Sequence, residues 1–294
     1  MKELFPFYKI GNFINQPDNP TDFEIMRFEE IEEPDVEDLH KHTFYEIIWI
    51  DKGKSRQVID YTDYEISPGS LFFISPGQLH IFEEWKPIEG GCIMFTEEFF
   101  LLNYIDKDKL FELSFLDNFY SHPVLRPDKK EFTAIKRTID QIAEEKKRKD
   151  YSASMSQALL HILLLQIQRC VDAQSGNTAS KKYLVLYKKF KNLIDKHFID
   201  NWGAGDYASH LAITQHHLNT IAKAVTGKTA TEVIRARSIL EAKRLLSFTD
   251  NSVSEVAANL GYFDSSYFAK IFKAETGMTP VEFKSTISES YRRR

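Results

Sequence analysis

The sequence contains few cysteines and no long apolar run. Cys92 and Cys170 are the two cysteines among 294 residues, and no CxxC pair occurs, which argues against a disulfide framework. The longest strongly apolar stretch, ALLHILLLQI, contains a histidine and is shorter than the about 20 residues that a membrane-spanning helix needs. No apolar segment follows the first three residues, so we expect no signal peptide. These absences predict a cytoplasmic protein without a membrane partner.

Charge is distributed unevenly along the chain. The net charge is −5, but residues 183–294 carry 16 Lys and Arg against 11 Asp and Glu, whereas the rest carries 22 against 32. An anionic partner is therefore expected only for the basic second part, although solvated surfaces also carry such charge. A content of 43% hydrophobic and 28% charged residues is typical of a globular protein of about two domains.

The hydrophobic patterns divide the chain into four segments. Residues 1–127 contain short runs of Phe, Tyr, Ile and Val between turn signals such as DKGK and SPGS, which predicts a β domain. Residues 128–171 predict two helices, residues 172–182 a polar linker, and residues 183–294 a helical domain.

A ten-residue phrase occurs twice in the helical domain, as KAVTGKTATE at 223–232 and KAETGMTPVE at 273–282. In each copy a glycine is expected to end a helix, because glycine adopts the left-handed conformation without steric cost. The following Thr and the Glu three residues later form a capping box, which starts the next helix. A duplication at a fixed offset indicates a repeated supersecondary unit.

The unit is clearest before the second copy. Ser252 and Glu255 form another capping box, Gly261 breaks that helix, and Asp264 caps a helix whose predicted buried face contains Phe268. Helix, tight turn and helix form a helix-turn-helix, and a shift of fifty residues gives a second one. The helix between them, about 24 Å long, could place two recognition helices roughly 34 Å apart, one DNA turn. The alternative is a helical bundle used for protein contacts.

Residues 183–294 resemble the DNA-binding domain of AraC/XylS-type transcription regulators, most closely in RARSILEAKRLL and SVSEVAANLGYFDSSYFAKIFKAETGMTPVEF. The resemblance implies double-stranded DNA as a partner, RNA polymerase as a further partner, and activation of transcription. The positions that it assigns to base reading are Ser266, Tyr267 and Lys270 in the second unit and His216, Asn219 and Thr220 in the first. Lys270 could donate to guanine and Asn219 could pair with adenine.

Four basic residues of the same domain are candidates for phosphate contacts, which position a protein on DNA without reading its sequence. They are Lys223, Lys273, Arg235 and Arg237. The first unit has Ala222 where the second has Phe272, so we expect the first recognition helix to be seated less firmly.

In the β domain, His40, His42 and Glu46 share strand parity and point to one face. The spacing H-x-H-x3-E-x6-G, followed by P-G-x7-G-x2-H ending at His80, resembles the two motifs of the cupin β-barrel over residues 35–95. The pattern departs at Pro34, where Gly is expected, and at Glu84, where Asn is expected. The resemblance implies an antiparallel barrel, which regulators of this family carry as a sensor.

Two roles are open for this motif. The four side chains His40, His42, Glu46 and His80 could hold Fe, Mn, Ni or Zn. Alternatively, they line a pocket for an unknown small-molecule effector, formed by His42, Phe44, Glu46, Ile48, Phe72, Ile74 and His80. A metal would also allow a different reading, in which the barrel is a metalloenzyme, for example an oxygenase, attached to a DNA-binding domain.

The sequence thus predicts an α+β protein: a cupin-like barrel at 1–127, a helical dimerisation region at 128–171, a linker, and a tandem helix-turn-helix domain at 183–294. We expect a non-enzymatic regulator, because no Ser-His-Asp grouping or phosphate-binding loop stands out. We expect a homodimer whose seam is the ALLHILLLQI helix together with Phe132, Ile135 and Ile139. The alternative is that this helix only packs on its own barrel.

Overall fold

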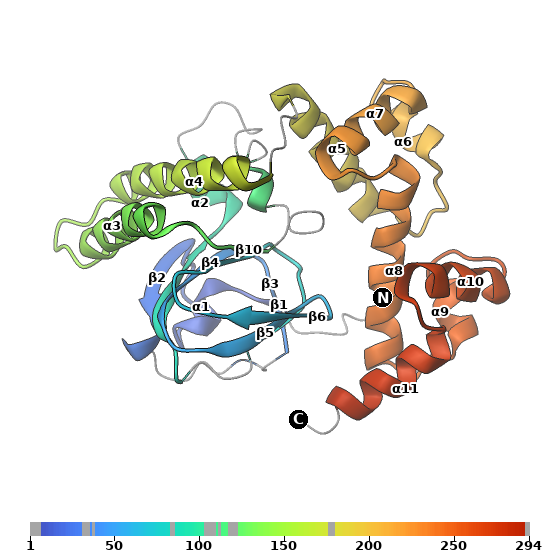
Figure 1. Ribbon diagram of the computed structural model, residues 1–294, viewed down its shortest axis with the longest axis horizontal. Helices are drawn as coiled ribbons and strands as arrows, with labels where there is room; N and C mark the ends of the chain where they lie inside the picture. Colours follow the sequence, from blue (N-terminus) through green and yellow to red (C-terminus); the bar gives the residue numbers. More distant parts are fainter. Residues whose placement is uncertain are drawn as a thin grey trace. The chain divides into compact units, whose positions relative to one another are not determined.

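A computed structural model of the protein describes residues 7–30, 36, 39–82, 86–102, 110, 113–116, 123–175 and 180–291. The chain divides into two compact units, one up to residue 178 and one from residue 179 (Figure 1). The predicted fold class is confirmed: the first unit is rich in antiparallel strands and carries two long helices, and the second is helical. Pro34, Glu84 and part of the predicted linker lie outside the described residues.

The first unit contains two antiparallel sheets and one short parallel pair. The five-stranded sheet has the order β10-β7-β4-β9-β2, the three-stranded sheet has the order β6-β5-β8, and β1 pairs with β3. The strands are β1 (Phe7–Tyr8), β2 (Phe23–Arg27), β3 (Lys41–His42), β4 (Tyr45–Lys52), β5 (Ser55–Ile59), β6 (Thr62–Ile66), β7 (Leu71–Ile74), β8 (His80–Phe82), β9 (Glu89–Phe95) and β10 (Val124–Leu125).

The two sheets enclose one apolar cluster. Ile48 of β4 and Phe72 of β7 come from the larger sheet, and Ile59 and Ile66 come from the smaller one. All four side chains are buried. The sheets therefore pack face to face and form the predicted barrel interior.

The other face of the larger sheet is covered by helices. Ile47 and Trp49 alternate with Ile48 along β4, so they point away from the barrel interior. They share a second core with α3 (Lys129–Lys146) and α4 (Ala153–Ser175), which lie side by side (Figure 1). The short helices in the described part of this unit are α1 (Ile10–Phe13), α2 (Glu97–Leu101) and the 3-10 turns Phe28–Glu30 and Ser114–Leu116.

The two long helices differ in how much of their surface the unit covers. Ile135 and Ile139 of α3 are each 1% exposed because they pack on the sheet, so they cannot contribute to a dimer seam. In α4, by contrast, Met155, Ile162 and Leu165 are 51%, 48% and 45% exposed. Phe132 of α3 is partly buried against the same core. The outer stripe of α4 is therefore the part of the expected seam that stays exposed, and the dimer itself stays a prediction.

The second unit contains two helix-turn-helix pairs joined by one long helix. Helices α6 (Ala204–His210) and α7 (Gln215–Thr226) form the first pair, and α9 (Val253–Asn259) and α10 (Ser265–Thr276) form the second. Within this unit, α8 (Ala230–Phe248) runs between them (Figure 1). The remaining helices are α5 (Lys181–His197) and α11 (Pro280–Tyr291).

The helix ends predicted from the repeat are confirmed. Gly227 and Gly277 end α7 and α10 with φ of 75° and 79°. All three capping boxes form, with each Thr or Ser backbone N–H donating to the carboxylate of its Glu at 2.6–2.7 Å. In the described part of the chain, no helix is long and apolar enough to cross a membrane.

The two cores on either side of β4 make a testable prediction. Ile47→Ala and Ile48→Ala should each lower the free energy of unfolding by about 2–5 kcal/mol, because both side chains are fully packed. Lys54→Ala, in the exposed turn after β4, should change it by less than about 0.5 kcal/mol. Urea unfolding followed by circular dichroism measures all three. If Ile47→Ala lowers the free energy of unfolding but Ile48→Ala leaves it unchanged, the barrel interior is not packed around Ile48.

Candidate barrel site and DNA-reading surface

Three of the four predicted metal-ligating side chains converge inside the barrel. Nε2 of His42 lies 3.6 Å from Oε2 of Glu46, and Nε2 of His80 lies 3.8 Å from the same oxygen. One ligand atom from each of these residues lies within 4.8 Å of the others. His40 lies beside them, bonded through its backbone to His80, with its ring centroid 4.4 Å from that of His80.

Burial disfavours the charged form of each group in this cluster. Desolvation, helped by the nearby His40, lowers the pKa of His42 to about 3. The same causes hold the pKa of His80 well below its usual value. Desolvation also raises the pKa of the Glu46 carboxyl. The two imidazoles are therefore uncharged near neutral pH, the form in which histidine binds a metal.

The ring of His42 is the least satisfied polar group of the site. Among the described residues, neither of its nitrogens has a hydrogen-bond partner, although the side chain is completely buried. The ring stacks on Phe44 with centroids 4.0 Å apart, and the Phe13 ring stands edge-on to it at 6.3 Å. A buried polar atom without a partner costs about 1–3 kcal/mol, so this position favours a bound group that accepts or donates there.

The predicted pocket residues lie together. Phe44, Ile48, Phe72 and Ile74 belong to one buried cluster, next to the histidines. Sequence reasoning missed Cys92 and Met94 of β9, which pair in register with Ile48 and Glu46 and belong to the same cluster. Cys92 and Met94 are two residues apart in GGCIMF, and this strand spacing could have predicted that both side chains point into the barrel. It also missed Phe13, whose place over the site depends on how the N-terminal segment folds.

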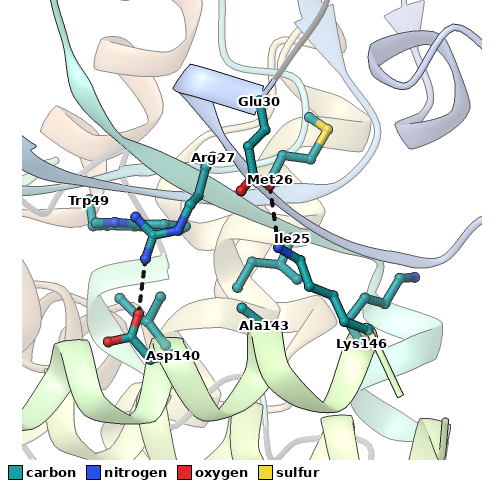
Figure 2. Close-up of a pocket in the computed structure, with 10 residues that line it drawn as sticks. Ile25, Met26, Arg27, Glu30, Trp49, Asp140, Ala143 and Lys146 are labelled. Carbon is teal, nitrogen blue, oxygen red and sulfur yellow. Dashed lines mark hydrogen bonds and ion pairs between the residues drawn. The ribbon is translucent and has the colours of Figure 1, made fainter. Parts of the chain in front are cut away.

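A small, partly open pocket lies on the outside of the larger sheet. Figure 2 shows it between β2 and β4 on one side and α3 on the other, with Arg27 bonded to Asp140 at 3.1 Å. Lys136 bonds to the same carboxylate at 2.6 Å and lies over the Trp49 ring at 5.6 Å. These charges hold α3 on the sheet.

In the second helix-turn-helix, α10 presents the predicted base-reading residues to solvent. Ser266, Tyr267 and Lys270 are exposed, whereas Phe268 and Phe272 on the opposite face are fully buried. The buried phenylalanines fix the rotation of the helix, and therefore which residues it presents.

In the first helix-turn-helix, only part of the predicted set is exposed. His216 and Thr220 face solvent, but Asn219 is half-buried and its Oδ1 accepts a hydrogen bond from the Ala230 backbone at 2.9 Å. The fifty-residue offset places His217, not Asn219, at the position of Tyr267. His217 is half-buried and its ring contacts Tyr183 at 5.9 Å. Ala222 is fully buried, as Phe272 is, but its smaller side chain buries less surface, so the looser seating of α7 stays a prediction.

The candidate phosphate-binding residues differ in exposure. Lys223 and Lys273 are exposed. Arg235 contacts Glu275 at 3.4 Å. The Arg237 side chain is 11% exposed, bonds to Asp195 of α5 at 2.7 Å and lies over the Phe198 ring at 4.1 Å. This geometry favours a packing role for Arg237.

Sequence comparison matches both units to known domain families. The profile of the AraC-like ligand binding domain matches residues 29–163, and that of a helix-turn-helix domain matches residues 207–286. HTH-type transcriptional activator RhaR of Cronobacter sakazakii is 26% identical over 245 residues, covering 82% of this chain and 84% of that protein. RhaR of Yersinia pestis bv. Antiqua (strain Angola) is 26% identical over 264 residues, covering 85% and 86%.

Among solved structures, ToxT from Vibrio cholerae O395 covers 91% of this chain and 95% of its own, at 15% identity and a TM-score of 0.41. A DNA-binding transcriptional dual regulator from Escherichia coli K-12 covers 35% of this chain and 93% of its own, at 21% identity and a TM-score of 0.33. These scores add nothing to the two domain matches. With both domains matched in the expected order, the chain belongs to the AraC family of DNA-binding transcription regulators, with an N-terminal ligand-binding domain and a C-terminal helix-turn-helix domain.

Proposed function

We propose that the protein reads a specific DNA sequence chiefly with α10 and activates transcription in the cytoplasm in response to a small molecule. The observation that carries this proposal is the exposed row of Ser266, Tyr267 and Lys270 over the buried Phe268 and Phe272. The names of the RhaR relatives support activation. We assign no enzymatic activity to the chain, and RNA polymerase is its proposed protein partner.

The contacts of α7 differ from those proposed for α10. His216 and Thr220 are exposed and can face a base, whereas the side-chain amide oxygen of Asn219 accepts a hydrogen bond from the Ala230 backbone N–H in the first turn of α8. We assign Asn219 to positioning α8, and the exposed Lys223 and Lys273 to phosphate contacts. Arg237 then holds α8 against α5, and Arg235 holds it against α10.

The barrel interior, within the proposed effector domain at 1–127, is the proposed effector site. It combines an apolar wall, including Ile48 and Phe72, with the polar group formed by His42, Glu46 and His80. Binding sites for small molecules are typically apolar with a few convergent polar groups. The site residues are buried, so an effector must displace part of the covering segment, where Phe13 lies over Phe44.

The outer stripe of α4 supports a homodimer, formed through the helical region at 128–171 and joined by the linker to the DNA-binding domain. Met155, Ile162 and Leu165 lie on one face of the helix and remain about half exposed. A symmetric dimer would cover this stripe with the same stripe of a second copy. Two copies would bring four recognition helices to the DNA.

A second candidate function follows from the barrel geometry. Two ligands at about 2.1 Å from a tetrahedral zinc ion lie roughly 3.4 Å apart, close to the 3.6 and 3.8 Å observed here. His42, Glu46 and His80 would then hold the ion, and the unsatisfied His42 nitrogens fit that role. A bound metal would supply a Lewis acid that anchors an effector or is itself sensed. A metalloenzyme is the further alternative.

For DNA binding, Lys270→Ala should weaken binding to a duplex selected from a randomised library by about 1–3 kcal/mol and relax discrimination at one base pair. Lys273→Ala should weaken all sequences alike and reduce the salt slope by about one. Fluorescence anisotropy at several salt concentrations measures both. Lys196→Ala, which removes an exposed charge from α5, is the matched control. Unchanged discrimination in Lys270→Ala would contradict the base-reading assignment.

For the dimer, Ile162→Lys should convert the protein to a monomer, because it places a charge at the centre of the apolar stripe. Sedimentation velocity gives the mass. Ile199→Lys makes the same change at an isoleucine that is 38% exposed in the other unit, and should leave the dimer intact. A wild-type monomer, or a dimer that tolerates Ile162→Lys, would rule out this seam.

For the metal, native mass spectrometry with elemental analysis should find about one divalent ion per chain in the wild type. His42→Ala should lose it, whereas His210→Ala in the helical unit should keep it. If the wild-type protein binds no metal after incubation with Zn²⁺, Fe²⁺, Mn²⁺ or Ni²⁺, the metal site is excluded, and the remaining role of this cluster is to line the effector pocket. Oxidation of a substrate by the metal-loaded protein, lost in His42→Ala, would instead favour the enzyme.

A further inference from the structure

The turn between α9 and α10 carries an exposed aromatic side chain. Phe263 has a relative exposure of 101%, whereas Phe268 and Phe272, in the helix that follows, are fully buried. It is also far more exposed than Tyr267, at 56%. An aromatic ring that keeps all of its surface in water gains nothing from folding.

The fold of the turn does not require a phenylalanine at this position. Gly261 makes the sharp bend with φ of 78°, and a Cβ there would clash with the Ile199 carbonyl oxygen. The Tyr262 backbone donates to Ala257 at 2.9 Å. The Asp264 carboxylate caps α10 by accepting from Ser266 at 2.7 Å. The residues on either side of Phe263 therefore fix the turn, and its own side chain contributes no packing.

The position of Phe263 makes it part of the DNA-reading surface. It directly precedes the residue that caps α10, and the exposed Ser266 and Tyr267 follow in the first turn of that helix. The N-terminal end of a recognition helix is the part that approaches base edges. In the first unit, the fifty-residue offset places the half-buried Ile213 here, so only the second unit carries this ring.

Resting on the proposed role of α10, we propose that Phe263 reads a thymine by packing its ring against the 5-methyl group in the major groove. Thymine is the base that presents an apolar group there, and phenylalanine is a side chain that contacts it. A protein partner is less well supported, because the polar residues Asp264, Ser265 and Ser266 directly follow Phe263. The adjacent Asp264 carboxylate also disfavours a contact with phosphate.

The test uses the full chain and a duplex selected with it from a randomised library, in which each thymine in turn is replaced by deoxyuridine. One replacement should weaken wild-type binding about fourfold, the effect of one buried methyl group. Phe263→Ala should weaken binding to the original duplex about tenfold and no longer respond to that replacement. Its salt slope should be unchanged, because no charge is lost.

Two further variants make the result interpretable. The midpoint of urea unfolding should be the same for Phe263→Ala as for the wild type, because the ring is fully exposed. Val281→Ala, which truncates a side chain 66% exposed on α11, should bind and respond as the wild type does.

Each other outcome overturns a defined part of the proposal. If Phe263→Ala binds normally while Lys270→Ala is impaired, the thymine contact is wrong and the role of α10 stands. If neither variant is impaired, the role of α10 fails as well. If Phe263→Ala weakens DNA binding tenfold but no single replacement of thymine by deoxyuridine weakens wild-type binding, the proposed methyl contact is wrong. Normal DNA binding with lost transcription in vitro shows that the ring meets a protein.

Discussion

The first unit depends on burying both faces of its larger sheet. Strand β4 shows this most directly, because Glu46 and Ile48 point into the barrel while Ile47 and Trp49 point toward α3 and α4. Neighbouring residues of one strand thus belong to two different cores. The ion pairs of Asp140 with Arg27 of β2 and of Lys136 with Asp51 of β4 then join α3 to the sheet.

The second unit uses burial to orient a helix rather than to build a cavity. Phe268 and Phe272 on the buried face of α10 determine which side chains this helix presents, and Leu218 and Ile221 do the same for α7. The capping boxes set where α8, α9 and α11 begin, so the length of each turn is fixed by local hydrogen bonds. The duplicated phrase contains the capping boxes that begin α8 and α11, whereas the box of Ser252 and Glu255 that begins α9 lies outside it.

The features predicted correctly from sequence are those with a period or a spacing. The repeat gave the helix-turn-helix pairs, and the parity of His42 and Glu46 placed them on one face. Predictions about single side chains were less complete, because tertiary neighbours determine their contacts. The Asn219 amide caps a helix eleven residues away, and the Arg237 guanidinium bonds to Asp195, forty-two residues distant. No local pattern contains either contact.

Because both faces of the larger sheet are buried, a ligand bound in the barrel can change the packing of the helices on the outer face. Protein interiors are close-packed, so a group bound beside Glu46 cannot displace β4 without moving Ile47 and Trp49 against the helices. The ion pairs of Asp140 with Arg27 and of Lys136 with Asp51 join α3 to β2 and β4, so they limit how far α3 can slide on the sheet. Because α3 packs against α4, this favours a movement that the two helices share. The exposed stripe of α4 lies on the far side of that helix from the sheet. A change at the barrel site would therefore reach the proposed dimer surface through a single layer of packed side chains.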